Sequence, residues 1–300
     1  MHGDIPVARL PTQGWLELPV AVFNGARPGP RIWVSAAIHG DELNGVEVVR
    51  ELVEQLDPAK LAGALVAAPV VNVFGFTARS RYTPDGRDLN RVFPGNKRGS
   101  LASRLAALFM GEIVAQCELG IDLHTAAEGR TNVPQVRCDT GQAKLRELAG
   151  VFGSSIVLHS RPGKGTLRGA AAKKGIPVLL FEGGGPHTFD RAVVREGLNG
   201  LKRIMNHLDM YHWRVPKVSR APVEYSSSRW LRAPCSGLFR PKIAVGAKVQ
   251  QGQILGSIGD TLGGCPREVR ALFGGRVIGG ATHPLVHQGD ALLHVAQLEG

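Results

Sequence analysis

Several features that would assign this chain to a class of protein are missing from its sequence. No apolar run approaches the ~20 residues that a membrane-spanning helix needs, and the N-terminal residues show no basic leader followed by an apolar segment. Cysteine is scarce, and no two cysteines form a CxxC pair. The four cysteines are Cys117, Cys138, Cys235 and Cys265. Such separated thiols are typical of a reducing compartment, so we predict a cytoplasmic protein with free thiols and no membrane association.

Acidic residues are too few to balance the basic ones. The sequence has 36 Lys and Arg against 25 Asp and Glu, which gives a net charge of +11. This charge raises the hypothesis of a non-catalytic zinc-binding or nucleic-acid-binding protein. However, the basic residues are spread along the chain, and the densest region, residues 202–232, matches no nucleic-acid-binding module. We therefore predict no nucleic-acid partner and interpret the charge as a solvated basic face, which can also attract anionic small substrates.

The residues that are present predict a large α/β part. With 43% apolar residues among 300, the chain can build one large domain and a smaller one. Apolar, often β-branched segments alternate with segments of helical period, which predicts a sheet with helices on both faces. The predicted strands are 31–38, 64–71, 119–124, 155–159 and 177–182, and the predicted helices are 42–56, 101–117, 142–151 and 190–210.

The pattern changes near residue 212. Residues 211–229 contain two prolines and a run of three serines, which predicts a linker. Beyond it the strands are short and glycine is frequent, and residues 232–238 recur loosely as 270–277. We therefore predict two domains, 1–212 and 213–300, of which the second is a small pseudo-symmetric β-sandwich.

The most informative motif is His39-Gly40-Asp41-Glu42, which lies where a predicted strand gives way to a predicted helix. His124 ends another predicted strand, and functional groups gather beyond the strand ends of such sheets. Catalytic zinc takes three protein ligands and keeps one position open for water. We therefore predict that His39, Glu42 and His124 bind one Zn²⁺ per chain, although these ligand types also suit cobalt or manganese. Asp122 points to the same face of its strand as His124 and could orient it.

Glu182 ends the apolar strand Val178-Leu179-Leu180-Phe181 and precedes three glycines. A carboxylate in this position is costly to bury unless a charged or polar group meets it. We predict that Glu182 is the general base, which takes a proton from the zinc-bound water and passes it to the leaving amine. The structural alternative is a salt bridge to one of the many arginines.

Asn90 and Arg91 lie in a polar, turn-rich segment. Arg91 can clamp a substrate carboxylate through two parallel hydrogen bonds, and Asn90 can add a donor. Arg79, Arg81 and Arg87 lie nearby in the sequence. Of these three we select Arg81 as the residue that stabilises the oxyanion of a tetrahedral intermediate.

Four motifs taken in order are similar to one known family. They are His39–Glu42, Asp88–Pro94, Asp122–Thr125 and Phe181–Gly185. Together they resemble the succinylglutamate desuccinylase/aspartoacylase family, the deacylase branch related to the zinc carboxypeptidases, and the resemblance covers nearly the whole chain. It implies a zinc-carboxypeptidase-like mixed sheet flanked by helices, with a small C-terminal β-sandwich or barrel.

The resemblance also implies a zinc-dependent hydrolase that cleaves the amide bond of an N-acyl amino acid or a related small acylated amine. His39, Glu42 and His124 fall on the zinc-ligand positions of the family, and Glu182 falls on the general-base position. Asn90 and Arg91 fall on the pair that holds the substrate carboxylate, and Arg81 falls near the oxyanion arginine. The alternative is a zinc carboxypeptidase that trims C-terminal residues of peptides.

The C-terminal module resembles the biotinyl/lipoyl barrel as well. A carrier domain of that type needs a lysine at the tip of the hairpin between its half-repeats, and residues 259–266 contain none. We therefore interpret the module as structural, either as a cap over the active site or as a surface for homo-oligomerisation.

Overall fold

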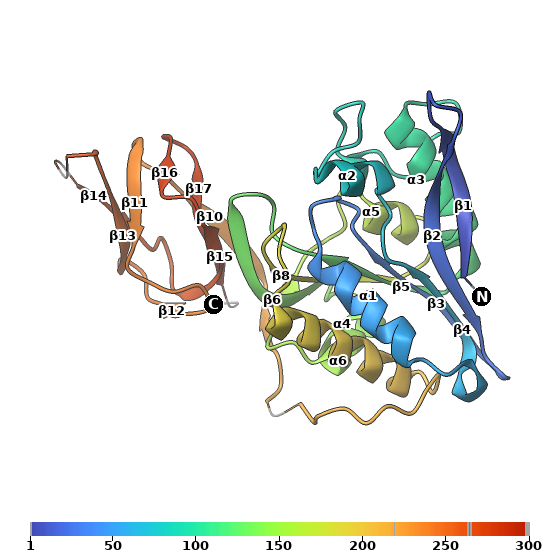
Figure 1. Ribbon diagram of the computed structural model, residues 1–300. Coiled ribbons are helices and arrows are strands. Elements are labelled where there is room, and N and C mark those ends of the chain that lie inside the picture. The colour runs from blue at the N-terminus through green and yellow to red at the C-terminus, as the bar shows by residue number, and fades with distance from the viewer. Residues whose placement is uncertain (1, 219, 263, 265, 298–300) are drawn as a thin grey trace.

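A single large sheet runs through most of the chain. The computed structural model describes residues 2–218, 220–262, 264 and 266–297, so Cys265 lies outside the described residues. Figure 1 shows a larger α/β part joined to a smaller β part. Within the described residues, a 13-stranded sheet extends through both parts, and a second sheet of four strands belongs to the smaller part. The predicted fold class, a mixed sheet flanked by helices plus a small C-terminal β unit, is confirmed.

Four parallel strands form the centre of the large sheet. In spatial order they are β4 (Ala62–Ala68), β3 (Arg27–Ala36), β5 (Leu119–His124) and β8 (Val178–Gly184). Their apolar side chains, such as Val34, Ile121 and Leu179, are fully buried because helices cover both faces. The carboxyl ends of parallel strands meet at one edge, so His124 and Glu182, paired in register on β5 and β8, lie side by side there.

Helices cover both faces of this central sheet (Figure 1). On one face lie α1 (Asn44–Gln55), α4 (Ala143–Phe152) and α6 (Arg191–His207), and on the other lie α2 (Val73–Ala78), α3 (Leu101–Glu112) and α5 (Leu167–Ala172). The other helices of each group bury their apolar stripes in a separate core on their own side of the sheet, whereas Val73 of α2 packs with Ala37 and Val70. Hydrogen-bonding caps start several of these helices: Ser100 accepts from the backbone of Ser103, and Asp190 accepts from Ala192 and Val193.

The helix predicted over 101–117 is shorter than expected. It ends at Glu112 and continues as a single 3₁₀ turn, η3 (Val114–Gln116), with Ile113 and Val114 buried in the core beneath α3. Two further 3₁₀ turns, η1 (Pro58–Lys60) and η2 (Leu89–Arg91), lie in loops. The second of these contains both residues of the predicted carboxylate clamp.

Several strands were not predicted. At the N-terminal edge, β1 (His2–Arg9) and β2 (Trp15–Asn24) pair with each other, and β2 continues onto β4. Their sequences contain proline, which is tolerated at sheet edges but obscures a strand pattern. The strand β6 (Arg130–Cys138) was also missed, because Pro134 and a polar composition hide it.

The missed strand β6 joins the two parts of the molecule. It pairs antiparallel with β8 on one side and with β15 (Gly275–Ala281) on the other, and parallel with β7 (Ile156–His159). In Figure 1, β6 lies between the helical part and the C-terminal strands. Side chains of the smaller part are thereby placed close to the strand end that carries Glu182.

The smaller part is a β-sandwich with its own apolar core. Its strands are β10 (Ser227–Arg232), β11 (Gly237–Pro241), β12 (Lys248–Val249), β13 (Ile254–Gly259), β14 (Arg267–Arg270), β15, β16 (Leu285–Val286) and β17 (Ala291–Gln297). The two half-repeats interleave, because β12 pairs with β15 of the second copy and β16 pairs with β11 of the first. This exchange of short strands accounts for the internal similarity of the sequence.

The linker predicted over 211–229 is shorter than expected. A short strand, β9 (Val223–Tyr225), pairs with β7, and β10 begins at Ser227. Tyr225 is buried against Ile156 and Ile278, so the end of the predicted linker is part of the packed structure. The boundary at 212/213 falls between α6 and β9 and stays a prediction, because the large sheet continues across both parts.

Candidate active site

The three predicted metal ligands converge at the carboxyl edge of the sheet. His39 follows β3, Glu42 precedes α1, and His124 is the last residue of β5. One ligand atom of each lies within 4.8 Å of those of the other two. All three residues are buried, with exposed fractions of 3%, 1% and 6%. The arrangement therefore brings together residues from three separate segments of the chain.

Each imidazole lies between two carboxylates. Nδ1 of His39 is 2.7 Å from Oε1 of Glu42, and its Nε2 is 3.1 Å from Oδ1 of Asp88. Nδ1 of His124 is 2.8 Å from Oε2 of Glu42, and its Nε2 is 2.9 Å from Oδ2 of Asp122. A neutral imidazole has only one N–H, so one of its two contacts would oppose two lone pairs. Each imidazole therefore satisfies both of its contacts only when it carries a second proton or when a metal cation takes the place of one proton.

The pKa values of these groups reflect the same pairing. Burial opposes the charged form of both histidines, but the facing carboxylates outweigh it and raise the pKa of His39 and of His124. Burial would raise the pKa of Glu42, yet the two histidines lower it. The donor set of two imidazoles and one carboxylate fits a zinc ion. The second nitrogen of each imidazole is held by a further carboxylate, as is usual for histidines that bind zinc.

The outer carboxylates are themselves fixed. Oδ1 of Asp122 accepts a 2.8 Å hydrogen bond from the hydroxyl of Ser35 on the neighbouring strand β3. Oδ2 of Asp88 accepts a hydrogen bond from Nη2 of Arg81 at 2.9 Å. Burial alone would raise the pKa of Asp88, but the neighbouring His39 and Arg81 outweigh it, so the pKa is lowered. The position of Asp122 beside His124 agrees with the expectation that it could orient this ligand.

The local backbone explains how the first motif reaches the site. Ala37 has a positive φ of 47°, which turns the chain at the end of β3. A side chain at Gly40 would lie 2.0 Å from the backbone of Gly75 and Phe76, so only glycine lets this loop pack against α2. His39 and Glu42 are thereby held as the first and last residues of a tight turn, in which the backbone N–H of Glu42 donates to the carbonyl oxygen of His39.

Of the three candidate oxyanion arginines, one lies at the site. Arg81 lines the same cavity as the three ligands, and its Nη1 is 3.4 Å from Oε1 of Glu42. Arg79 ends α2 in the left-handed conformation, and Arg87 pairs with Asp85. Neither Arg79 nor Arg87 lines this cavity.

Asn90 and Arg91 border the same cavity from η2. Oδ1 of Asn90 accepts from the backbone N–H of Leu167, which leaves its amide nitrogen without a described partner. Arg91 donates through Nη1 to the backbone oxygen of Asn90 and forms no ion pair with any described carboxylate. Both residues therefore retain donors that a bound carboxylate could use.

Glu182 also lines the cavity, and its carboxylate is held at both oxygens. Oε1 accepts from Nδ2 of Asn132 at 2.7 Å, and Oε2 lies 2.9 Å from Nε of Arg137. The salt bridge weighed as the structural alternative is thus present. It does not remove Glu182 from the site, since the side chain stays 13% exposed and borders the same cavity as the ligands.

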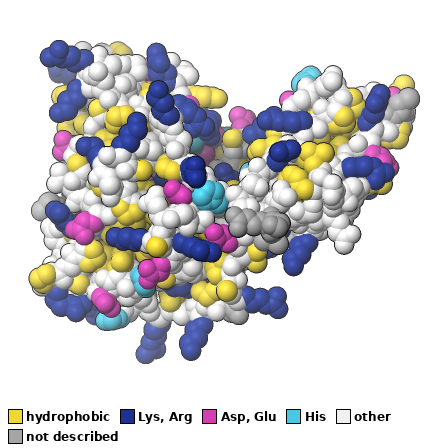
Figure 2. All heavy atoms as spheres, turned by 180° about the vertical axis from the view of Figure 1, so that it is seen from behind, with side chains coloured by type: hydrophobic (Ala, Val, Ile, Leu, Met, Phe, Trp, Pro, Cys, Tyr) yellow, Lys and Arg dark blue, Asp and Glu magenta, His cyan; other side chains and the backbone are white. Residues whose placement is uncertain are grey.

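The whole cavity has a volume of about 380 Å³ and is strongly basic. Its lining includes five arginines but only two acids, Glu42 and Glu182. Figure 2 shows the surface hollowed between the larger and smaller parts, with basic side chains dispersed over both. Within the described residues, no helix is both long and apolar enough to cross a bilayer.

Comparison with known proteins identifies the group to which this site belongs. The sequence pattern of the succinylglutamate desuccinylase/aspartoacylase catalytic domain matches residues 28–208. The chain belongs to this family. Its members are deacylases, so membership indicates an enzyme that acts on N-acyl amides. A curated relative, N-alpha-acetyl-L-2,4-diaminobutyric acid deacetylase of Halomonas elongata, is 26% identical over 95% of this chain and 87% of its own length.

Other relatives agree with this membership. A probable aspartoacylase of Parasynechococcus marenigrum is 32% identical over 43% of this chain and 45% of its own. The crystal structure of a succinylglutamate desuccinylase/aspartoacylase from Rhodobacter sphaeroides superposes with a TM-score of 0.90, at 26% identity, over 100% of this chain and 95% of that one. The ectoine utilization protein EutE (DoeB) of Ruegeria pomeroyi has the same fold, with a TM-score of 0.90, 24% identity and coverage of 99% and 95%.

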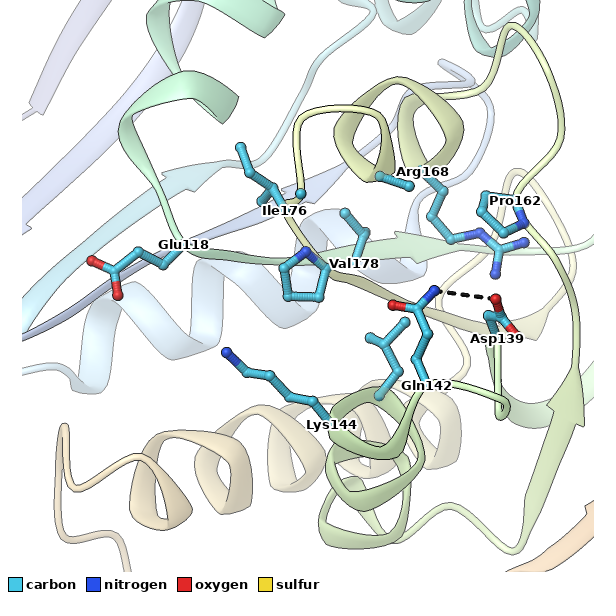
Figure 3. A pocket seen from close by; sticks show the side chains of 12 residues that line it. Glu118, Asp139, Gln142, Lys144, Pro162, Arg168, Ile176 and Val178 are labelled. Carbon is cyan, nitrogen blue, oxygen red and sulfur yellow. Dashed lines mark hydrogen bonds between the residues drawn. The ribbon is translucent and has the colours of Figure 1, made fainter.

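A second cavity, of about 290 Å³, is also present. Arg168 lines both this second cavity and the candidate active-site cavity. Figure 3 shows the side chains of the second cavity, where Gln142 donates to Asp139 and charges of both signs, Glu118 and Lys144, line it. Among the described residues, none of the buried polar atoms that lack a partner belongs to this second cavity. Two of them, Oδ1 of Asn132 and Nδ1 of His294, belong to residues that line the first cavity.

The sequence did not point to several residues that line the candidate active-site cavity of this protein. They are Arg130, Asn132 and Arg137 on β6, Arg168 on α5, and Trp230 and His294 on β10 and β17. No motif marks them, because β6 itself was not recognised and the last two come from the smaller part. The one available signal is the basic composition, which predicts a solvated basic face that can also attract anionic small substrates.

Proposed function

We propose that this protein is a zinc-dependent amidohydrolase that cleaves the amide bond of an N-acyl amino acid or a related small acylated amine. One observation carries the proposal. His39, Glu42 and His124 converge in a single cavity that is also lined by Glu182, Arg81 and the Asn90–Arg91 pair. The predicted ligand, base, oxyanion and clamp residues thus share one space large enough for a small molecule.

Each residue has a defined task in this proposal. A zinc ion bound by His39, Glu42 and His124 supplies Lewis acidity, polarising a carbonyl and making water more acidic. Glu182 accepts the proton of the attacking water and passes it to the departing amine. Asn132 and Arg137 hold both oxygens of that carboxylate and so fix its direction.

The arginines divide the remaining work. Arg81 is anchored by Asp88 and reaches the ligand set through Nη1, so it supports the negative charge that develops on the carbonyl oxygen. Arg91 and the amide nitrogen of Asn90 hold the carboxylate of the substrate. A peptidase that trims C-terminal residues would use the same groups, but the cavity, which Trp230 and His294 of the smaller part also line, has a volume of only about 380 Å³. The proposal therefore favours small acylated amino acids over peptides.

The test combines metal analysis with a hydrolysis panel. We expect about one zinc per chain, and amine release from N-acyl amino acids that stops on chelation and returns with zinc. Replacing Glu182 with Gln should leave the zinc bound and lower kcat by about 10²- to 10⁴-fold, the usual contribution of a general base. Glu118→Gln, which removes a carboxylate from the second cavity, is the matched control and should keep full activity.

Three results would contradict the proposal. Full turnover by the Glu182→Gln protein would exclude Glu182 as the base. Cleavage of peptides without cleavage of acylated amino acids would favour the carboxypeptidase alternative. A protein that binds no metal even after zinc is added would exclude the ligand assignment.

A further inference from the structure

Both oxygens of the Glu182 carboxylate are held by residues of β6. Oε1 accepts a hydrogen bond from Nδ2 of Asn132, and Oε2 lies 2.9 Å from Nε of Arg137. On its other side β6 pairs with β15 of the smaller part, where Asn132 is in register with Gly279. The oxygen Oε1 is therefore connected to the smaller part through a single residue.

A second connection passes through Gln135, which is fully buried on β6. Its Oε1 accepts a hydrogen bond from Nε of Arg137 at 3.3 Å. Its Nε2 donates to two backbone oxygens, that of Val133 at 3.3 Å and that of Ile278 on β15 at 3.4 Å. A glutamine amide has two N–H donors and one carbonyl oxygen, so both donors and the oxygen of Gln135 have partners.

Two irregularities of the sheet explain why a buried amide is needed at this position. Val133 lies where the register of β6 against β8 shifts, and Ile278 lies where the register of β15 against β17 shifts. Such a bulge leaves a residue out of the ladder, so its buried backbone groups need other partners. The amide of Gln135 meets the carbonyl oxygens of both residues and thereby joins the two bulges across the boundary between the larger and the smaller part.

The same amide restricts the side chain of Arg137. A free arginine has many rotamers, and ordering it costs conformational entropy. Nε of Arg137 donates to Oε1 of Gln135 and also lies 2.9 Å from Oε2 of Glu182. Gln135 thus contacts the nitrogen that holds the carboxylate, and its own amide is fixed by two further hydrogen bonds. Support of this kind from a buried neighbour keeps a functional group in one direction.

We propose that Gln135 is a positioning residue, which ties Arg137, and through it Glu182, to β15 of the smaller part. This inference rests on the proposed function, in which Glu182 is the base. Both oxygens of the base are then connected to adjacent residues of β15, Ile278 and Gly279. The smaller part therefore sets the direction of the base, in addition to lining the cavity.

Replacing Gln135 with Met tests this connection, because methionine is unbranched and of similar length but has no N–H donor. We expect kcat to fall by on the order of 10-fold, a fraction of what a general base contributes, with KM and zinc content unchanged. Gln135→Asn keeps an amide that ends one methylene short of Arg137, and should give a smaller loss of the same kind. If Gln135→Met does not fold, this milder variant provides the test.

Two comparisons separate positioning from a loss of stability. Asn206 on α6 also joins two segments, since its amide bonds to both the N–H and the carbonyl of Trp213, and it does not line the cavity. Asn206→Leu should therefore lower the stability but keep wild-type kcat. In a Glu182→Gln background, Gln135→Met should have no further effect on the residual turnover, because it acts only through Glu182. A purely structural role would lower that residual turnover as well.

Crystal structures of the wild type and of the folded Gln135 variant keep this inference separate from the proposed function, because they need no turnover. We expect Arg137 to change its side-chain conformation in the variant, so that the 2.9 Å contact between its Nε and Oε2 of Glu182 is lost. This result supports the connection even if the wild type hydrolyses none of the N-acyl amino acids. An unchanged position of Arg137 and Glu182, wild-type kcat in both Gln135 variants, or an equal loss of turnover with and without Glu182 would overturn it.

Discussion

The two sides of the cavity differ in how completely their polar groups are satisfied. On the side built by β3, α1 and β5, both nitrogens of His39 and of His124 face carboxylates, and those carboxylates have further partners. On the side built by β6 and the smaller part, the guanidinium of Arg130 has no hydrogen-bonding partner among the described residues, and Nδ1 of His294 is buried without one. The first side has a donor set that could hold a metal ion, whereas the second side contains polar groups without a partner.

The largest effect is expected from a variant that disrupts the first side of the cavity. Replacing His124 with Ala removes one of the three proposed zinc ligands and the imidazole that faces Oε2 of the buried Glu42. We expect zinc affinity to fall by more than the ~100-fold that loss of an outer partner can cause, and turnover to fall to background. Metal content and activity measured on the same sample check this. Trp230→Leu, on the opposite side of the cavity, should retain zinc, and an equal loss of metal in both variants would refute the division into two sides.

A smaller effect is expected when only an outer partner is changed. Asp122→Asn keeps the size of the side chain but removes the charge that holds Nε2 of His124. Zinc affinity should fall by about 10- to 100-fold, while full metal loading at high zinc restores most of the turnover. Competition with a chelator measures the affinity. Ser35→Ala, which removes only the hydrogen bond to the other oxygen of Asp122, should have a weaker effect of the same sign.

The third prediction concerns the contact between Gly279 of the smaller part and Asn132 on β6. Oδ1 of Asn132 lies 2.1 Å from the position that a Cβ at Gly279 would occupy, so the smaller part seats the residue that holds Glu182. Gly279→Ala should displace Asn132 and lower kcat by on the order of 10-fold, a fraction of what a general base contributes, with zinc content unchanged. It should also destabilise the fold by about 1–3 kcal/mol through overpacking.

A glycine elsewhere provides the control for this variant. Gly111 lies in α3, and a Cβ there would meet nothing within 4 Å. Gly111→Ala should raise the stability by about 0.5–1 kcal/mol and leave kcat unchanged. If Gly279→Ala retained wild-type kcat, Asn132 would have no positioning role toward Glu182.

The same comparison shows which parts of the molecule the sequence could predict. The ligand side was predictable because its residues end apolar strands: β5 begins and ends at the predicted residues, and His124 is its last residue. The other side was not, because β6 is polar and contains Pro134, so it does not read as a strand. His294 and Trp230 reach the cavity only because β15 pairs with β6, a contact between residues nearly 150 positions apart that no local pattern encodes.

The lengths of the helices and of the linker were predicted less accurately than their presence. The helix expected to reach residue 117 ends at Glu112, and the linker expected to reach residue 229 ends where β9 begins, at Val223. In both places tertiary packing decides the boundary: Ile113 and Val114 are buried beneath the helix, and Tyr225 joins the core between the two parts. Local composition therefore located the elements, and burial set their ends.

The last prediction concerns the stability contributed by the neutral histidine of the second side. The pKa of His294 is about 3 in the folded protein, and the ordinary value of 6.5 applies to the unfolded chain. Between these values the unfolded chain binds one more proton, so His294 lowers the stability by about 1.4 kcal/mol for each pH unit below 6.5. In His294→Gln this contribution is absent. The free energy of unfolding of the variant, relative to that of the wild type, should therefore rise by that slope as the pH falls from 6.5 to 4.5. A constant difference across this range would mean that His294 is not held neutral in the folded protein.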